Sequence, residues 1–236
     1  MTVIGIIPAR YASTRFPGKV LAPIHDYPMV HQVYRRALEC ATLDEVIIAT
    51  DSPLVAETCI NLGDRVVLTG SQHVSGTDRV AEVAQDLDAE LIVNIQGDEP
   101  QLEAGVVDQL VAHMQANPHL AMGTVGSTIL TPDDLVNPNV VKVIGKNSLA
   151  VGFYRNLPAV PPAGDQLRHV GLYAYRRGFL LQLSAQPPSL REREQRLEQL
   201  RALDMGTLIG LVAVDYSAVA VDTPEDLERV VAAWHE

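Results

Sequence analysis

The chain has 236 residues, a length that suits one large α/β domain or one domain with a small lobe. Hydrophobic residues make up 47% and charged residues 20%, an ordinary globular composition that excludes a disordered chain. The net charge of −11 disfavours nucleic acid and anionic lipid as partners, because a negative field repels both. Two cysteines, Cys40 and Cys59, are too few for a disulfide framework and favour a reducing compartment.

No stretch approaches the roughly 18 consecutive apolar residues of a membrane span. The apolar N-terminus lacks a basic start and runs into Pro8 and Arg10, so it predicts a buried strand instead of a signal peptide. We therefore expect a cytoplasmic protein with no membrane partner.

Apolar runs alternate with amphipathic stretches along the first half of the chain. The runs predict strands at residues 3–8, 45–50, 65–69 and 91–96. The amphipathic stretches predict helices at residues 29–40, 53–62, 77–87 and 103–115, the third with Thr77 as its N-cap. This alternation is typical of an α/β fold with a doubly wound, mostly parallel sheet.

The second half of the chain contains mostly strands. Strands are predicted at residues 122–129, 140–144, 149–154, 170–175 and 208–214. Helices are predicted at residues 190–203 and 223–234. We expect these strands to continue the sheet in mixed orientation and to form a smaller subdomain.

A basic loop comes directly after the first predicted strand. The first 25 residues contain Arg10, Arg15 and Lys19 but no acidic residue, although the whole chain is acidic. The end of this strand is where an α/β sheet presents its binding crevice. Small residues and cations together suit a polyphosphate. The glycine patterns of P-loop ATPases and of dinucleotide-binding reductases are both absent, which disfavours those two classes.

Two acidic residues come after predicted buried segments and are candidates for holding Mg²⁺. Asp98 comes just after the strand at 91–96, and Asp222 precedes the last helix. Both also suit an ordinary turn or helix cap.

Residues 73–79 lie at the start of a predicted helix. Their hydroxyl groups, their main-chain N–H groups and Arg79 could bind a base or a ribose, and the same residues could equally form an ordinary capped helix start. No nucleophile constellation is present, which favours in-line transfer of a phosphoryl-type group.

Seven blocks of the sequence carry a family resemblance. They are residues 7–19 (IPARYASTRFPGK), 49–51 (ATD), 73–79 (HVSGTDR), 93–100 (VNIQGDEP), 169–176 (HVGLYAYR), 197–201 (LEQLR) and 221–227 (VDTPEDL). Together, and in this order, they resemble the 3-deoxy-manno-octulosonate (Kdo) cytidylyltransferase family, the CMP-Kdo synthetases. The resemblance spans almost the whole chain.

The resemblance implies a Rossmann-like nucleotidyltransferase fold that forms a homodimer. The reaction implied is CTP plus an acidic acceptor giving a CMP-linked acceptor and pyrophosphate, with Mg²⁺, as a step of lipopolysaccharide synthesis. Residues 1–236 would form one domain, with a CTP-binding half at 1–120 and an acceptor-binding and dimerisation half at 121–236.

The resemblance also assigns individual residues. The CTP phosphates would be bound by Arg10, Ser13, Arg15 and Lys19, and the cytidine by Ser75, Gly76 and Arg79. Mg²⁺ would be held by Asp98 and Asp222. The acceptor would contact Gln96, His169, Tyr173 and Glu198. Catalysis would depend on Arg15 and Lys19, which offset growing negative charge, and on Asp98 through the metal.

One segment departs from the family pattern. Family members carry a Trp-Asp-Arg-Asp-like segment where this chain has residues 156–164 (NLPAVPPAG), which hold no charge and no Trp. A small phosphonate such as phosphonoformate is therefore an alternative acceptor, with Arg155 or Arg168 offsetting its charge. Two further alternatives are another sugar nucleotidyltransferase and a non-catalytic CTP-binding sensor.

Overall fold

The structure is a computed structural model that describes residues 1–12, 16–73, 75–217 and 220–234. The chain forms two compact units. The first unit contains residues 1–108 and 218–236, and the second contains residues 109–217. The C-terminal segment therefore returns to the unit in which the chain begins.

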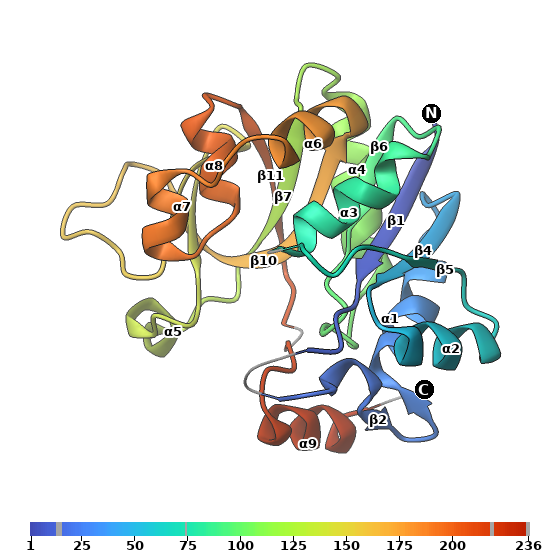
Figure 1. The fold of residues 1–236 in the computed structure, drawn as a ribbon. Coiled ribbons are helices and arrows are strands. Elements are labelled where there is room, and N and C mark those ends of the chain that lie inside the picture. Colours follow the sequence, from blue (N-terminus) through green and yellow to red (C-terminus); the bar gives the residue numbers. More distant parts are fainter. Residues whose placement is uncertain (13–15, 74, 218–219, 235–236) are drawn as a thin grey trace. The chain divides into compact units, whose positions relative to one another are not determined.

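The first unit is built on a parallel sheet (Figure 1). Its strands are β1 (Val3–Pro8), β4 (Glu45–Thr50), β5 (Val66–Leu68) and β6 (Leu91–Asn94), in the order β5-β4-β1-β6. Its helices are α1 (Met29–Leu38), α2 (Pro53–Asn61), α3 (Gly76–Gln85) and the first part of α4 (Ala104–Ala116). Side chains such as Ile6, Ile47 and Ile92 are fully buried, as expected for strands covered on both faces. The predicted α/β alternation is confirmed.

A small second core lies beside this sheet and brings the chain's last helix into the first unit. Its buried side chains come from β2 (Pro23–Ile24), the start of α1, and the segment before α9 together with α9 itself (Pro224–Ala232). The short helix η1 (Lys19–Leu21) precedes β2, and β3 (Tyr27–Pro28) pairs with β2 as a hairpin. Ile24, Met29, Val221 and Val230 are its buried members. Thr223 caps α9 in a capping box with Asp226, which fixes where the helix begins.

The second unit is a mixed sheet that closes on itself. Its strands are β7 (Met122–Ser127), β8 (Lys142–Lys146), β9 (Leu149–Tyr154), β10 (Asp165–Arg176) and β11 (Ile209–Val214), in the order β10-β7-β11-β9-β8. The first part of β10 also pairs with β8, which completes the ring. β11 runs parallel to β7, and the other described pairs are antiparallel. The predicted mixed orientation is confirmed.

Three short helices and one longer helix complete the second unit. They are α5 (Pro132–Val136), α6 (Arg177–Ser184), α7 (Leu190–Gln195) and α8 (Gln199–Asp204). No helix among the described residues is long and apolar enough to cross a membrane.

The structure corrects two local predictions. The helix predicted at 190–203 is two helices, α7 and α8, because Arg196 adopts a left-handed conformation (φ 54°) that ends α7. The N-cap of α3 is Ser75 and not Thr77, since the Ser75 hydroxyl accepts the Asp78 N–H at 3.0 Å. Both errors concern short polar segments. The hydrophobic pattern there does not distinguish one helix from two, or one N-cap residue from its neighbour.

A buried lysine ties several loops of the second unit together. The Lys142 side chain in β8 is fully buried, and its ammonium donates to the carbonyl oxygens of Val140 (2.7 Å), Asn137 (3.0 Å) and Arg155. Desolvation by burial lowers the pKa of this ammonium. The carbonyl groups thus take the place of water around the charge.

We predict that Lys142→Met destabilises the protein by about 1–3 kcal/mol, because it leaves several part-buried carbonyl oxygens without their donor. Urea unfolding measures the change. Lys146→Met is the matched control, since Lys146 is exposed in the same strand and its loss is expected to change stability by less than about 0.5 kcal/mol. Equal stability of the two variants would contradict the structural role of Lys142.

Candidate active site

Three sequence blocks of the first unit converge at the carboxyl end of β1. A Cβ atom placed on Gly97, after β6, would lie 3.0 Å from the Pro8 carbonyl oxygen. A Cβ atom on Gly76, at the start of α3, would lie 3.4 Å from Cγ of Pro8. The carboxyl ends of parallel strands are where α/β sheets bind ligands. The end of β1 at Pro8, the start of α3 at Gly76 and the segment after β6 at Gly97 therefore meet where the sequence predicts a nucleotide site.

Lys19 is the centre of the charged cluster at this position. Its ammonium lies 2.6 Å from Oδ2 of Asp98 and 3.3 Å from Oδ1 of Asp222, and it donates to the Val221 carbonyl oxygen at 2.9 Å. The Lys19 side chain is only 12% exposed, against 27% for Asp98 and 40% for Asp222. The structure thus brings together three of the predicted site residues from distant parts of the sequence.

Local backbone geometry directs Lys19 toward the two carboxylates. Gly18 has φ 72°, which favours glycine, and its N–H donates to the Tyr11 carbonyl oxygen at 3.1 Å. A Cβ atom on Gly18 would also lie 3.2 Å from the Tyr11 ring. Glycine at position 18 therefore closes the basic loop and starts η1 at Lys19.

The oxygen atoms around Lys19 have the chemistry of a magnesium site. Two carboxylates from separate segments and one carbonyl oxygen converge on a cation, and Mg²⁺ prefers such hard oxygen ligands. In the part of the chain that the structure describes, no group of three or more His, Cys, Asp or Glu side chains could hold a metal by itself. Mg²⁺ is commonly held by one or two carboxylates together with substrate phosphates, so this donor set fits the predicted ion.

Arg79 is directed away from solvent and holds two loops together. Its side chain is 4% exposed, with Nη2 at 3.3 Å from Oδ1 of Asp51 and Nη1 donating to the Thr69 hydroxyl and the Gly70 carbonyl oxygen. Asp51 comes directly after β4, and Thr69 directly after β5. Arg79 therefore fixes the loops after both strands, and its predicted contact with cytidine stays a prediction.

Glu82 is a site-building residue that the sequence patterns did not predict. Its carboxylate accepts the Gly70 N–H at 3.1 and 3.2 Å and contacts His73 Nε2. The hydrogen bond with His73 lowers the pKa of Glu82. Glu82 lies three residues after Arg79 on α3, so this spacing on one helix face was the available signal. Together they hold the loop at 69–73 beside the start of α3.

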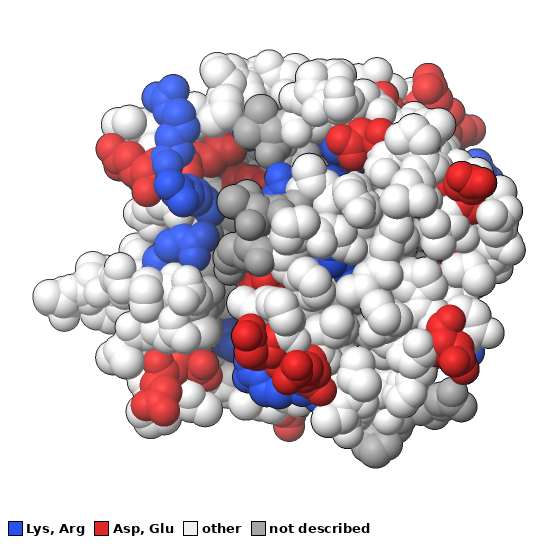
Figure 2. All heavy atoms as spheres, turned by 60° about the horizontal axis from the view of Figure 1, so that its bottom comes forward, with Lys and Arg blue, Asp and Glu red and all other residues white. Residues whose placement is uncertain are grey.

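The remaining predicted residues of the nucleotide half differ in how they are placed. Arg10 is exposed just after β1, and Gln96 is half-buried after β6. Ser13 and Arg15 lie outside the described residues. The face that carries α9 and β2 in Figure 1 shows basic and acidic side chains in small mixed groups (Figure 2).

In the second unit, His169 is a neutral hydrogen-bonding residue. Its Nε2 lies 3.1 Å from the Thr124 hydroxyl, which itself donates to the Leu172 carbonyl oxygen at 2.9 Å. That hydroxyl has one proton and has already donated it, so His169 must carry its own proton on Nε2 and leave Nδ1 as an acceptor. Burial lowers the pKa of His169 to about 3, which keeps the ring neutral at physiological pH.

The other predicted acceptor residues lie in the same unit. Tyr173 is buried in β10, with its ring centroid 5.5 Å from that of His169. Glu198 is exposed at the start of α8. Arg155 donates to the carbonyl oxygens of Gln195 (2.7 Å), Pro138 (3.2 Å) and Arg196 (3.2 Å). Arg168 donates to the Tyr216 carbonyl oxygen at 2.7 Å.

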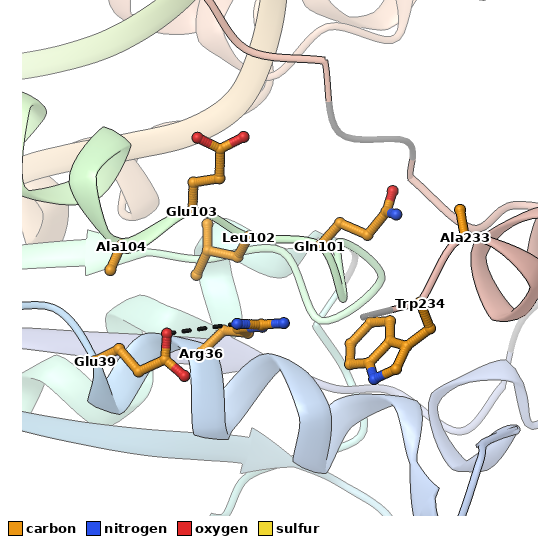
Figure 3. Close-up of a pocket in the computed structure, with 8 residues that line it drawn as sticks. All are labelled: Arg36, Glu39, Gln101, Leu102, Glu103, Ala104, Ala233 and Trp234. Carbon is orange, nitrogen blue, oxygen red and sulfur yellow. Dashed lines mark ion pairs between the residues drawn. The ribbon is translucent and has the colours of Figure 1, made fainter. Parts of the chain in front are cut away.

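A cavity of about 380 Å³ lies elsewhere in the first unit (Figure 3). It is lined by Arg36, Glu39, Gln101, Leu102, Glu103, Ala104, Ala233 and Trp234. The Arg36 guanidinium lies over the Trp234 ring, 5.5 Å from its centroid. This cavity contains none of the predicted site residues, so the Lys19 cluster, and not the cavity, is the better candidate for chemistry.

Comparison with known proteins identifies close relatives. A family model described as "Cytidylyltransferase" matches residues 4–209. The chain is 44% identical to a 3-deoxy-manno-octulosonate cytidylyltransferase of Geobacter sulfurreducens, over 98% of both chains. It is 46% identical to the enzyme of the same name from Solibacter usitatus, over 97% of this chain and 92% of that one.

Solved structures agree with these relatives. A CMP:2-keto-3-deoxy-manno-octonic acid synthetase complexed with CTP matches with a TM-score of 0.92 and 38% identity, over 99% of this chain and 98% of that one. A cytidylyltransferase from Leptospira borgpetersenii matches with a TM-score of 0.69 and 16% identity, over 100% of this chain and 89% of that one, which shows the shared fold alone.

We predict that His169 makes stability depend on pH below neutrality. Its folded-state pKa is below its unfolded value of about 6.5, so the unfolded chain takes up the proton first as pH falls. Stability should fall from about pH 6.5 downward, with a slope of at most about 1.4 kcal/mol per pH unit from this residue. Urea unfolding between pH 7 and pH 4.5 measures it.

His169→Asn should remove this part of the pH dependence. His119→Asn is the matched control, because His119 is exposed and its loss should leave the pH dependence unchanged. The interpretation is wrong if His169→Asn and the wild type have the same slope.

Proposed function

The chain belongs to the 3-deoxy-manno-octulosonate cytidylyltransferase family, and on that premise we propose that it transfers the cytidylyl group of CTP to 3-deoxy-manno-octulosonate (Kdo) and releases pyrophosphate. Family membership makes the chain a nucleotidyltransferase. The observation that carries the proposal is the meeting of Lys19, Asp98 and Asp222 at the carboxyl end of β1.

This cluster suits the binding of a nucleoside triphosphate. Arg10, Ser13, Arg15 and Lys19 would bind the phosphates, because cations and a hydroxyl on one loop can offset and hydrogen-bond several phosphate oxygens. Asp98 and Asp222 would hold Mg²⁺, which would supply further positive charge near the phosphates when bound. Ser75 and Gly76 would contact the nucleoside, and Gly76 lies beside Pro8.

The reaction needs charge and position more than a covalent intermediate. A hydroxyl oxygen of the acceptor attacks the α-phosphorus of CTP and gives up its proton to solvent, and the bond to the pyrophosphate oxygen breaks. Negative charge then grows on the α-phosphate and on the leaving group. Lys19 and Arg15 offset that charge, which lowers the barrier because such groups bind the transition state more tightly than the substrate.

The second unit would bind the acceptor through neutral contacts. His169 has an unprotonated Nδ1 that can accept a hydrogen bond from an acceptor hydroxyl, and its proton stays on Nε2 toward Thr124. Tyr173 would add a further neutral contact in this unit. The other acceptor residues that the family resemblance implies are Gln96, which belongs to the first unit, and Glu198, which has an acidic side chain. A polyhydroxylated acid such as Kdo offers many hydroxyl groups to such a site.

Two observations favour Kdo over a small phosphonate. The relatives described above are named for 3-deoxy-manno-octulosonate at more than 40% identity. Arg155 already donates to three main-chain carbonyl oxygens, which leaves it fewer donors for a phosphonate. The segment at 156–164 lies in an exposed connection between β9 and β10, where its composition can change without disturbing the strands.

We further propose a cytoplasmic homodimer. The second unit exposes large apolar side chains, among them Val136 (77%), Val151 (42%) and Val160 (86%), which a partner subunit could cover. We predict a dimer in sedimentation experiments and a shift toward monomer for Val151→Asp. A wild-type protein that is monomeric at micromolar concentration would contradict the homodimer.

We predict pyrophosphate release when the protein is mixed with CTP, Mg²⁺ and Kdo, and little release when UTP replaces CTP or when phosphonoformate replaces Kdo. A coupled pyrophosphate assay measures each rate, and Lys19→Ala should lower kcat sharply because it removes a phosphate-binding charge.

The other outcomes identify the alternatives. Pyrophosphate release with phosphonoformate but not with Kdo would show that the acceptor is a phosphonate. Release with UTP and a sugar phosphate would indicate another sugar nucleotidyltransferase. CTP binding without release for any acceptor would indicate a sensor.

A further inference from the structure

The Lys19 ammonium has no donor left for a phosphate in this structure. An ammonium has three N–H donors. The three oxygens around Nζ are Asp98 Oδ2 at 2.6 Å, Val221 O at 2.9 Å and Asp222 Oδ1 at 3.3 Å, one for each donor. Lys19 must therefore give up at least one of these partners before it can donate to a phosphate.

The main chain holds the two carboxylate-bearing residues close together. The Val221 N–H donates to the Asp98 carbonyl oxygen at 2.8 Å, which joins the loop after β6 to the segment before α9. Val221 is fully buried in the small core with Ile24, Met29 and Val230, so that segment is fixed. Both carboxylates lie within 3.3 Å of the same Lys19 nitrogen, and two negative charges that converge on one point repel each other unless a cation lies between them.

In the absence of Mg²⁺, the Lys19 ammonium supplies the positive charge between the carboxylates of Asp98 and Asp222. We propose that the Lys19 ammonium is the resident cation of the metal site, holding Asp98 and Asp222 together in the nucleotide-free protein and moving to the phosphates when Mg²⁺ and CTP enter. This inference rests on the proposed function, because it concerns the same site.

The exchange has a consequence for the order of binding. Mg²⁺ alone would have to displace Lys19 and leave its ammonium beside a divalent cation with no anion to receive it, which is unfavourable. CTP supplies that anion. Mg²⁺ and CTP should therefore each increase the affinity for the other through Lys19, and this coupling is reciprocal.

A permanent structural ion pair is the competing explanation for the same contacts. In that case, Lys19 stays paired with the carboxylates when ligands bind, and a variant without Lys19 binds Mg²⁺ no more tightly than the wild type. Mg²⁺ binding in the absence of nucleotide separates the two explanations, and it requires no turnover.

The decisive variant is Lys19→Met, which keeps much of the side-chain length and removes the charge. Isothermal titration with MgCl₂, without nucleotide, should show Mg²⁺ binding at least tenfold tighter than in the wild type. Thermal unfolding should show a lower midpoint for the variant in EDTA and recovery of that midpoint in millimolar Mg²⁺. Lys19→Arg, which keeps the positive charge, should bind Mg²⁺ as weakly as the wild type.

Two further variants keep the test decisive. Lys146→Met, which removes an exposed lysine of β8, should leave Mg²⁺ binding unchanged. If Lys19→Met is too unstable to purify, Lys19→Met combined with Asp222→Asn should restore folding, because the substitution removes one of the two repelling charges.

The inference is overturned if Lys19→Met folds and binds Mg²⁺ no more tightly than the wild type, or if Asp222→Asn fails to rescue an unstable Lys19→Met. The pyrophosphate assay on the wild type distinguishes this failure from failure of the proposed function. If the wild type is active and Lys19→Met does not bind Mg²⁺ more tightly, the inference about Lys19 is wrong and the proposed function stands. If the wild type is inactive but Lys19→Met binds Mg²⁺ more tightly, the proposed function is wrong and the inference about Lys19 stands.

Discussion

A single main-chain hydrogen bond, from the Val221 N–H to the Asp98 carbonyl oxygen at 2.8 Å, joins two segments that are more than 120 residues apart in the sequence. Val221 also packs in the small core with Ile24, Met29 and Val230, so apolar contacts hold it in place. Because Asp222 comes directly after Val221, this bond also sets the position of the second carboxylate. The charged part of the site thus depends on apolar packing by the chain's last helix.

The same arrangement explains why charges gather where the sheet ends. The carboxyl ends of β1, β4 and β6 lead into loops, and loops can present polar groups without interrupting a strand. Lys19 reaches the carboxylates through η1, and Arg79 and Glu82 hold the neighbouring loop from α3. Each charged group is paired within the unit, which limits the cost of desolvation.

Sequence patterns predicted the strands, most helices and the charged cluster, because these depend on periodicity and on the residue types at the end of each strand. Lys19, Asp98 and Asp222 were all expected on this basis, and they meet in the structure. The break at Arg196 was missed, since a left-handed residue in a polar stretch leaves no mark on the hydrophobic pattern. Glu82 was missed because a helical glutamate is most often a solvated charge, and its contacts with Gly70 and His73 depend on how the loop folds back.

The two units use charge in different ways. In the first unit, the Lys19 ammonium is held by carboxylates that a metal could also occupy, so its partners are exchangeable. In the second unit, Lys142, Arg155 and Arg168 donate to main-chain carbonyl oxygens, whereas Arg191 and Arg201 pair with the carboxylates of Asp204 and Glu192, which are not predicted site residues. Under the proposed function, the first unit would offset the negative charge of the triphosphate, and the neutral His169 of the second unit would offer an acceptor for a hydroxyl group. This division suits a triphosphate donor and a sugar-acid acceptor.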